Sequence, residues 1–174
     1  ILLPVFILLS FLIKTGSKGP IIFKQKRIGL YGNPFWIFKF RSMITEAEKD
    51  GPQLSSQNDP RITAIGKFMR KTRLDETPQF FNVIKGDMAI VGPRPEREYY
   101  IEKIVAKAPH YKHVLKVKPG ITSWGQIKFG YAENVDEMVA RLKFDLLYVE
   151  NMSLSLDVKI LFYTAIIMIK GDGK

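Results

Sequence analysis

Residues 71–96 read KTRLDETPQFFNVIKGDMAIVGPRPE and include two adjacent acidic residues, Asp75 and Glu76. The preceding run, 61–73, contains five Lys or Arg residues and no acidic one. A carboxylate can act as a metal ligand, a base or a nucleophile, and phosphoryl transfer depends on charge neutralisation by Mg²⁺ and arginine. The pattern therefore suits an enzyme that handles phosphates with a divalent metal. Taken alone, an acid pair that favours a helix macrodipole is the better explanation, because an Asp-Glu dipeptide by itself is a weak signal.

The same stretch predicts its own local structure. Thr77 and Pro78 are suited to the N-cap and first turn of a helix that runs to Gly86, where glycine ends it. The acid pair would then lie just before a helix N-terminus. Residues 87–91 predict a short buried strand, and the Gly-Pro-Arg-Pro sequence at 92–95 predicts a rigid turn that carries an extended arginine.

The composition favours one domain and an anionic partner. The chain has 174 residues, enough for a single domain with a core. Lys and Arg number 27 against 17 Asp and Glu, which gives a formal charge of +10. Nucleic acid, acidic lipid head groups and phosphorylated substrates all fit that charge. Because the sequence has no Cys, a disulfide framework and a thiolate metal site are excluded, and any metal must bind oxygen ligands.

The first residues form an apolar segment beside a basic one. Residues 1–13 carry no charge, but a helix of that length reaches only about 20 Å, short of a hydrocarbon core of about 30 Å. Pro4 would break or kink such a helix. Seven Lys or Arg and no acid occur in residues 1–45, which is typical of the cytoplasmic side of a membrane. We expect a re-entrant or interfacial element, with a truncated spanning helix or a signal-peptide remnant as alternatives, and a natural chain that continues upstream.

Periodicity and turn residues predict the remaining elements. Two short strands at 21–29 and 31–43 would form a hairpin around a Gly-Asn-Pro turn, and a polar loop follows at 47–60. Helices are expected at 62–71, 96–107, 111–117 and 134–151, and a strand or loop at 121–129. The apolar segment 154–169 is either the spine of the core or a helix in the membrane interface. The predicted fold is mostly helical α+β, with a small β-hairpin, amphipathic interfacial helices and a truncated N-terminal re-entrant membrane helix.

Several motifs occur along the chain in a fixed order. The acidic stretch contains Leu-Asp-Glu-x-Pro-Gln, Asn-Val, Gly-Asp-Met and Val-Gly-Pro-Arg-Pro. Upstream lie Phe-x-Gln-x-Arg-x-Gly at 23–29 and Lys-Phe-Arg-Ser-Met at 39–43. Downstream lie Lys-Pro-Gly-Ile-Thr at 118–122 and Asp-x-x-Tyr-Val-x-Asn at 145–151. In this order the motifs resemble those of the bacterial sugar transferases, the monotopic polyprenol-phosphate phosphoglycosyl transferases.

The resemblance implies an enzyme that transfers a sugar 1-phosphate from a nucleotide diphosphate sugar, expected to be a UDP-sugar, to polyprenol (undecaprenol) phosphate. The products would be a polyprenyl diphosphate sugar and a nucleoside monophosphate, at the start of polysaccharide or glycan assembly. Asp75 would attack the sugar-bearing phosphate to give a covalent phosphosugar intermediate, and Glu76 would position or deprotonate the acceptor. Mg²⁺ would bridge the diphosphate, with Asp75 as a ligand.

The resemblance also implies further site residues and a location. The expected substrate-binding residues are Lys39, Arg41, Arg70, Gln79, Pro93, Arg94 and Pro95. Residues 1–18 would be part of a re-entrant membrane helix kinked at Pro4, where Leu3 replaces the family's serine, and residues 19–174 the catalytic domain. The enzyme would lie in the bacterial inner (cytoplasmic) membrane, with its active site on the cytoplasmic face, in contact with anionic lipid and without nucleic acid. A homo-oligomer is left open.

Two other functions compete with this interpretation. A non-catalytic, basic membrane-surface module that binds anionic lipid or nucleic acid would explain the charge and the apolar segment. A soluble metal-dependent nuclease is disfavoured by the apolar N-terminus and by the absence of a spread-out carboxylate cluster. His110 and His113 are spaced like metal ligands, but no third ligand is evident nearby, so we expect surface helix residues.

Overall fold

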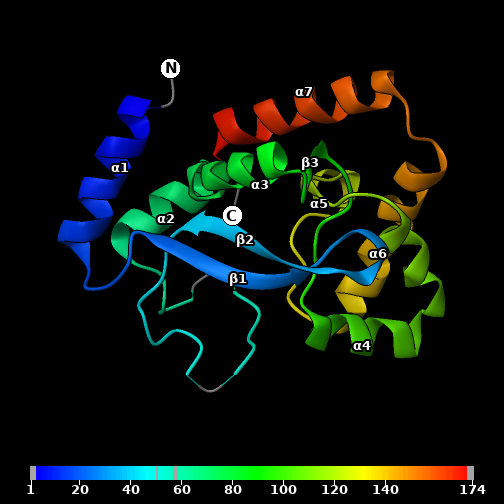
Figure 1. The fold of residues 1–174 in the computed structure, drawn as a ribbon, viewed down its shortest axis with the longest axis horizontal. Coiled ribbons are helices and arrows are strands. Elements are labelled where there is room, and N and C mark those ends of the chain that lie inside the picture. The colour runs from blue at the N-terminus through cyan, green and yellow to red at the C-terminus, as the bar shows by residue number, and fades with distance from the viewer. Residues whose placement is uncertain (1–2, 50, 57–58, 172–174) are drawn as a thin grey trace.

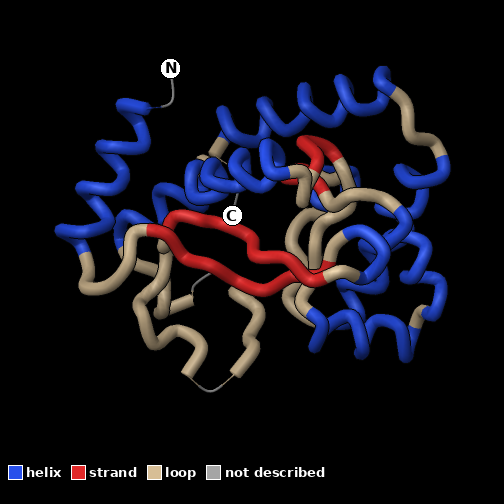
Figure 2. Tube along the Cα trace, in the orientation of Figure 1, coloured by secondary structure: helices blue, strands red, loops and turns tan. Residues whose placement is uncertain are grey.

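A two-stranded antiparallel hairpin crosses the middle of the molecule, with helices arranged around it (Figures 1 and 2). The computed structural model describes residues 3–49, 51–56 and 59–171. Strand β1 (Ile22–Ile28) pairs with β2 (Pro34–Phe40), which confirms the predicted hairpin. The turn differs from the prediction because a 3₁₀ turn at Leu30–Gly32 closes it. Pro34 already lies in β2, at the first position of the strand, where proline is tolerated.

Helix α1 (Leu3–Gly16) packs against α2 (Ala64–Lys71) at one end of the hairpin (Figure 1). Leu9 and Ile13 of α1 meet Met69 of α2 in a small buried core at this end. Lys67 and Lys71 of α2 are exposed, away from this core, and the helix predicted at 62–71 is confirmed over Ala64–Lys71.

The acid pair lies inside a helical turn and not before one. A 3₁₀ helix (Leu74–Gln79) leads directly into α3 (Phe80–Lys85), which Gly86 ends in the left-handed conformation. The prediction of Thr77 as N-cap is therefore wrong, because this residue lies within the turn. Its hydroxyl donates to the carbonyl oxygen of Leu74 at 2.8 Å, as Ser and Thr hydroxyls inside helical turns commonly do.

A short parallel pair, β3 (Ala89–Val91) and β4 (Gly120–Thr122), follows and confirms the strand predicted at 87–91. The two backbones approach closely at Gly92, where a β carbon would collide with the facing strand. Residues 121–129, predicted as strand or loop, hold the end of β4 and a short helix, α5 (Trp124–Lys128), with Ser123 as its N-cap. Five residues are too few for helical periodicity to show in the sequence.

Helices α4 (Glu98–Lys107) and α6 (Val135–Glu150) enclose the largest core cluster together with a 3₁₀ helix (Pro109–Lys116). Asn134 begins α6 by accepting the N–H of Glu137, and the helix predicted at 134–151 is confirmed. The segment predicted as a helix at 111–117 is helical but is wound as 3₁₀, with both histidines exposed.

Helix α7 (Leu154–Lys170) runs along the outside of the molecule (Figure 1). Ile160 is its one buried residue, so the alternative of a core spine is wrong. Within the described ranges, no helix is long and apolar enough to cross a membrane. The described part of α1 begins at Leu3, so the kink expected at Pro4 involves residues outside the description. The fold is a mostly helical α+β arrangement with one hairpin and one parallel strand pair.

Candidate active site

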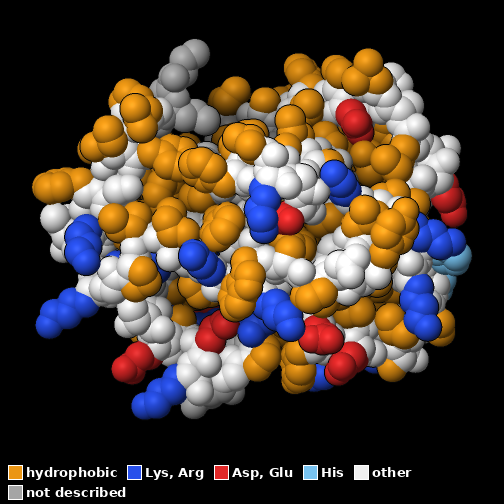
Figure 3. Space-filling model, viewed as in Figure 1, with side chains coloured by type: hydrophobic (Ala, Val, Ile, Leu, Met, Phe, Trp, Pro, Cys, Tyr) orange, Lys and Arg blue, Asp and Glu red, His pale blue; other side chains and the backbone are white. Residues whose placement is uncertain are grey.

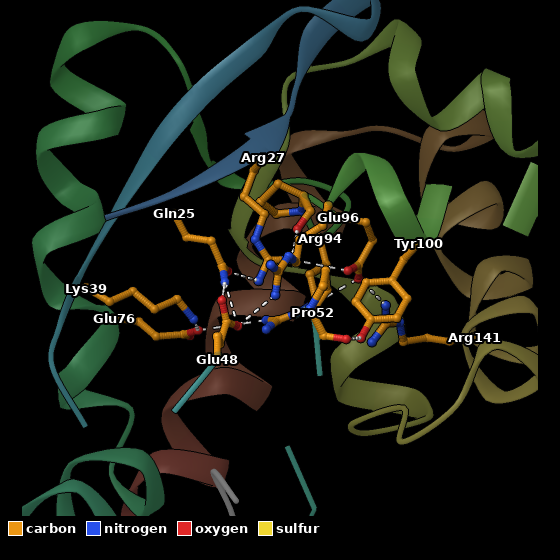
Figure 4. Close-up of polar contacts among 12 residues, drawn as sticks. Gln25, Arg27, Lys39, Glu48, Pro52, Glu76, Arg94, Glu96, Tyr100 and Arg141 are labelled. Atoms are coloured by element: carbon orange, nitrogen blue, oxygen red, sulfur yellow. Dashed lines mark hydrogen bonds and ion pairs between the residues drawn. The ribbon is translucent and has the colours of Figure 1, made fainter. Parts of the chain in front are cut away.

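A cavity of about 270 Å³ opens beside the hairpin, and twelve of its 28 lining residues are charged. Its walls come from both strands of the hairpin, from the loop after β2, from the acid pair and from the segment that leads into α4 (Figure 4). Eight basic residues line it: Arg27, Lys39, Arg41, Arg61, Arg70, Arg94, Arg97 and Arg141. Four acidic residues join them: Glu48, Asp75, Glu76 and Glu96. The cation excess makes the cavity suited to an anionic ligand.

The two carboxylates of the acid pair are both buried but have different partners. Glu76 is 4% exposed, and its Oε1 lies 2.6 Å from Lys39 Nζ and 3.8 Å from Arg94 Nη1 (Figure 4). Asp75 is 7% exposed and lines the same cavity, but no ion pair joins it to another residue that the structure describes. Glu76 is therefore bound by cations, whereas Asp75 forms no ion pair within the described residues.

Burial and charge move the two pKa values in opposite directions. Burial raises the pKa of Asp75 above its usual value, and the negative charge of Glu76 raises it further. Burial alone would raise the pKa of Glu76 as well, but Lys39 and Arg94 lower it below its usual value. Glu76 is thus a stable anion at neutral pH, whereas Asp75 is a basic carboxylate poised near the working range of an enzyme.

The amide of Asn82 fixes the strand that carries Lys39. Asn82 is fully buried on α3, and its Nδ2 donates to the carbonyl oxygen of Trp36 at 2.7 Å. Its Oδ1 accepts the backbone N–H of Phe38 at 3.1 Å. The amide therefore pairs with the outer edge of β2 as a neighbouring strand would. Because α3 continues directly from the turn that holds Glu76, this contact sets Lys39 against Glu76.

Arg70 reaches the cavity from the last turn of α2. Its Nε donates to Ser42 Oγ at 2.9 Å, and its Nη1 donates to Ser55 Oγ at 2.6 Å. The positive charge of Arg70 is close enough to lower the pKa of Asp75, against the larger effects of burial and Glu76. A guanidinium on serine hydroxyls retains its full charge, which an anionic ligand in the cavity would meet.

Glu96 anchors a second cluster of charges in the cavity wall. Its Oε1 accepts a hydrogen bond from Arg141 Nη2 at 2.6 Å, and its Oε2 accepts one from Arg27 Nη1 at 3.3 Å (Figure 4). The guanidinium of Arg94 lies 3.8 Å from both Glu96 and Glu76. Arg94 thus lies between Glu76 of the acid pair and Glu96 of the second cluster.

Comparison with known proteins shows the family to which this chain belongs. A family model described as bacterial sugar transferase matches residues 1–171. The chain belongs to the bacterial sugar transferase family. It is 42% identical over 170 residues to the UDP-N-acetylgalactosamine-undecaprenyl-phosphate N-acetylgalactosaminephosphotransferase of Aeromonas hydrophila, covering 98% of this chain and 40% of the relative.

Other sugar transferases are similarly related. The UDP-glucose:undecaprenyl-phosphate glucose-1-phosphate transferase of Escherichia coli K12 is 44% identical over 164 residues, covering 92% of this chain and 35% of the relative. The undecaprenyl-phosphate galactose phosphotransferase of Salmonella typhimurium is 38% identical over 174 residues, covering 91% and 35%. The chain thus spans 35–40% of the length of these curated relatives.

The sugar transferase cavity brings together some of the residues expected to bind substrate. Lys39, Arg41, Arg70 and Arg94 all line it with the acid pair. Arg41 differs from the others because its guanidinium donates to carbonyl oxygens at the C-terminal end of α1: those of Lys18, Ser17 at 2.8 Å and Ile13 at 3.3 Å. In this structure Arg41 therefore joins α1 to the cavity wall.

The remaining expected residues lie behind the wall. Gln79 is 2% exposed, and its Nε2 has no hydrogen-bond partner among the described residues. Pro93 and Pro95 flank Arg94 and do not line the cavity. They fix the backbone on both sides of this arginine, which directs its side chain.

The residues present suit a divalent metal ion. Glu76 Oε2 is buried without a hydrogen-bond partner in the described part of the chain, which leaves one carboxylate oxygen for a ligand. Asp75 supplies a second, unpaired carboxylate beside it. No group of three or more Asp, Glu, His or Cys residues converges within the described ranges. Mg²⁺ fits such a site, because it binds through one or two carboxylates and completes its shell with phosphate oxygens and water.

Sequence reasoning did not predict Glu96, Arg141 or Tyr131 as parts of the site. Glu96 ends the stretch quoted at the outset, but nothing in the sequence shows that three arginines surround it. The buried face of α6 carries two charged residues, Arg141 and Asp145, among apolar ones. The available signal for Arg141 was therefore a charge on a mainly apolar helix face, since a buried arginine requires a carboxylate. Tyr131 lies in a loop without periodicity and gave no signal.

Proposed function

We propose that the chain transfers a sugar 1-phosphate from a UDP-sugar to undecaprenyl phosphate, releasing a nucleoside monophosphate. Relatives at 38–44% identity bear the names of such transferases, acting on glucose, galactose or N-acetylgalactosamine donors. The observation that carries the proposal is the acid pair in a cation-lined cavity, with Asp75 unpaired and Glu76 held by Lys39. A diphosphate brings the negative charge that this cavity lacks.

In the proposed reaction Asp75 is the nucleophile. An Asp75 carboxylate oxygen attacks the sugar-bearing phosphorus, and the bond from that phosphorus to the bridging oxygen of the diphosphate breaks as the nucleoside monophosphate leaves. A phosphate oxygen of undecaprenyl phosphate then attacks the same phosphorus, which forms the diphosphate linkage and returns the Asp75 carboxylate. Because its pKa is raised by burial, Asp75 is more basic than an exposed aspartate and yet ionised above about pH 6.

The neighbouring groups would bind and orient the phosphates. Arg70 and Arg94 present guanidinium groups to the cavity, which match phosphate oxygens in geometry and charge. Glu76, already ionised and bound to Lys39, acts as a fixed anion that keeps Lys39 in place, and is poorly suited to accept a proton. Asp75 and Glu76 together would hold Mg²⁺, which supplies neutralisation of the diphosphate charge.

An apolar face would bring this cavity to the lipid acceptor. Figure 3 shows hydrophobic side chains gathered over the part of the surface formed by α1, α3 and α7, with most charged side chains below it. Exposed members include Phe11 on α1, Ile84 on α3 and Phe162 on α7. We propose that this face lies on the cytoplasmic side of the bacterial inner membrane. On this proposal residues 1–18 belong to a re-entrant membrane helix and residues 19–174 form the catalytic domain.

The decisive experiment replaces the nucleophile. Asp75→Asn should abolish release of nucleoside monophosphate from UDP-sugars in the presence of undecaprenyl phosphate and Mg²⁺. Asp136→Asn is the matched control, because Asp136 is exposed and pairs only with Lys107 among the described residues. Retained turnover in Asp75→Asn would overturn the assignment of Asp75 as the nucleophile.

A second measurement tests the covalent step. Donor labelled in its sugar-bearing phosphate, incubated with Mg²⁺ and without undecaprenyl phosphate, should leave label on wild-type protein and none on Asp75→Asn. Unlabelled protein under conditions that support full turnover would instead indicate direct transfer between the two substrates.

A further inference from the structure

The ring of Tyr131 contacts two arginines at the edge of the active site. The guanidinium carbon of Arg94 lies 5.5 Å from the ring centroid, and that of Arg73 lies 5.7 Å from it. Both distances are within the range of a cation–π interaction, which is stronger where water is excluded. Tyr131 lines the cavity with Arg94, whereas Arg73 is 6% exposed and lies behind the wall.

These two guanidinium groups make fewer hydrogen bonds to the protein than those of other arginines in the site. Arg27, Arg70 and Arg141 all donate hydrogen bonds to protein acceptors. Arg94 makes ion pairs at 3.8 Å, beyond hydrogen-bond distance, and its guanidinium donates no hydrogen bond to another residue in the described part of the chain. Two cations on one ring repel each other, so an anion that binds between or beside them would remove an unfavourable interaction.

The side chain of Arg73 is also unsatisfied. Its Nε is buried without a hydrogen-bond partner, and no ion pair joins it to another described residue. Its positive charge contributes to the lowered pKa of Glu76, which places it near the acid pair. The backbone of Arg73 is left-handed, with φ 55° and ψ 18°, a conformation that L residues other than Asn and Asp rarely adopt.

Arg73 combines a strained backbone with a buried Nε that has no hydrogen-bond partner among the described residues, two positions before the proposed nucleophile. Both features are costly for stability. Such arrangements persist where function requires them. Glycine would adopt this left-handed backbone conformation at lower cost in free energy. The fold therefore does not require arginine at position 73, and we attribute the residue to a function of its side chain.

We propose that Tyr131 is a positioning residue that holds Arg94 and Arg73 as a pair, so that their charges act together on the diphosphate of a nucleotide ligand. Arg94 meets the phosphates directly in the cavity. Arg73 adds a second positive charge from behind the ring. The identity of the ligand rests on the function proposed above, but the anion-binding pair does not, because it follows from the charges and contacts alone.

The test measures UDP binding by the full chain in detergent, by calorimetry, without any transfer reaction. Tyr131→Leu removes both cation–π contacts and should weaken UDP affinity about tenfold. Tyr131→Phe keeps the ring and should bind as the wild type does. Tyr163→Leu is the matched control, because Tyr163 on α7 makes a cation–π contact with Lys128 of α5 and does not line the cavity. Wild-type affinity in Tyr131→Leu, or equal losses in Tyr131→Phe and Tyr131→Leu, would overturn the positioning role of the ring.

A second variant separates binding from folding. Arg73→Gly relieves the left-handed backbone, so its melting temperature should equal or exceed that of the wild type while its UDP affinity falls severalfold. Lower stability with unchanged UDP affinity would show that Arg73 is structural. If UDP binding depends on Tyr131 and Arg73 but no sugar phosphate is transferred, the pair is supported and the proposed function fails.

Discussion

Replacing each acid of the pair by its amide should change stability in opposite directions. The pKa of Asp75 rises from 3.8 to about 6 in the folded protein. A carboxyl group with a raised pKa favours the folded state below pH 4 and loses that advantage as the pH rises through 6. At about pH 7.5 the ionised Asp75 therefore costs about 3 kcal/mol, and Asp75→Asn should recover most of it. For a chain of this size the melting temperature should rise by about 6–10 °C.

Glu76→Gln provides the opposite case at the adjacent position. The pKa of Glu76 falls from 4.5 to about 2, so this carboxylate stabilises the fold above pH 4.5 and loses that contribution as the pH falls toward 2. Glu76→Gln should therefore lower the free energy of unfolding at neutral pH by about 3 kcal/mol, since the substitution leaves Lys39 buried without an anionic partner.

Differential scanning fluorimetry in one detergent, from about pH 4 to pH 8, measures both effects. The gain in Asp75→Asn should vanish near pH 4, where the wild-type carboxyl is also neutral, and should grow as the pH rises through 6. A lower melting temperature for Asp75→Asn at pH 7.5, or a gain that does not change with pH, would refute the reasoning. The first result would mean that an unrecognised cation stabilises Asp75.

Three further predictions concern the same wall. Formation of the phosphosugar intermediate should slow as the pH falls through about 6, because the protonated Asp75 is a poor nucleophile; a rate that is flat from pH 5 to 8 in single-turnover labelling would contradict this. Asn82→Asp should cost about 2 kcal/mol, because the new carboxylate cannot donate to the Trp36 carbonyl oxygen, and it should lower turnover by displacing Lys39; urea unfolding and steady-state assays report the two effects. Arg41→Leu should release the end of α1 and make residues 14–18 sensitive to limited proteolysis, and Arg41→Lys should not restore protection, because one ammonium cannot reproduce the fork.

The sequence predicted the elements whose pattern is local. The hairpin and α6 each carry a period of two or 3.6 over enough residues to be recognised, and glycine marks the end of α3. Thr77 was misassigned because its hydroxyl can bond to different backbone partners. The helical turn begins at Leu74, four residues before the predicted start at Pro78, so Thr77 lies inside the turn and its hydroxyl donates to the Leu74 carbonyl oxygen.

The site was predictable only in part, for a physical reason. Asp75, Glu76 and Arg94 lie within 20 residues of one another in the quoted stretch, so a single motif contains them. The contact between Arg141 and Glu96 joins residues 45 apart, and it depends on how α6 packs against the rest of the fold. No local pattern encodes that packing. Arg41 shows the converse: the motif identified it, but only the structure shows that its hydrogen bonds go to α1.

The attachment of Arg41 to the end of α1 has a mechanical consequence. Arg41 is followed in the chain by Ser42, whose hydroxyl accepts a hydrogen bond from Arg70 inside the cavity. Two consecutive residues thus connect the apolar helix to a cation beside the nucleophile, with no flexible segment between them. A tilt of α1 would act as a lever on Arg70. On the proposal that α1 is embedded in the membrane, the thickness of the bilayer, to which an embedded helix can adapt by tilting, would thereby influence the rate of the proposed reaction.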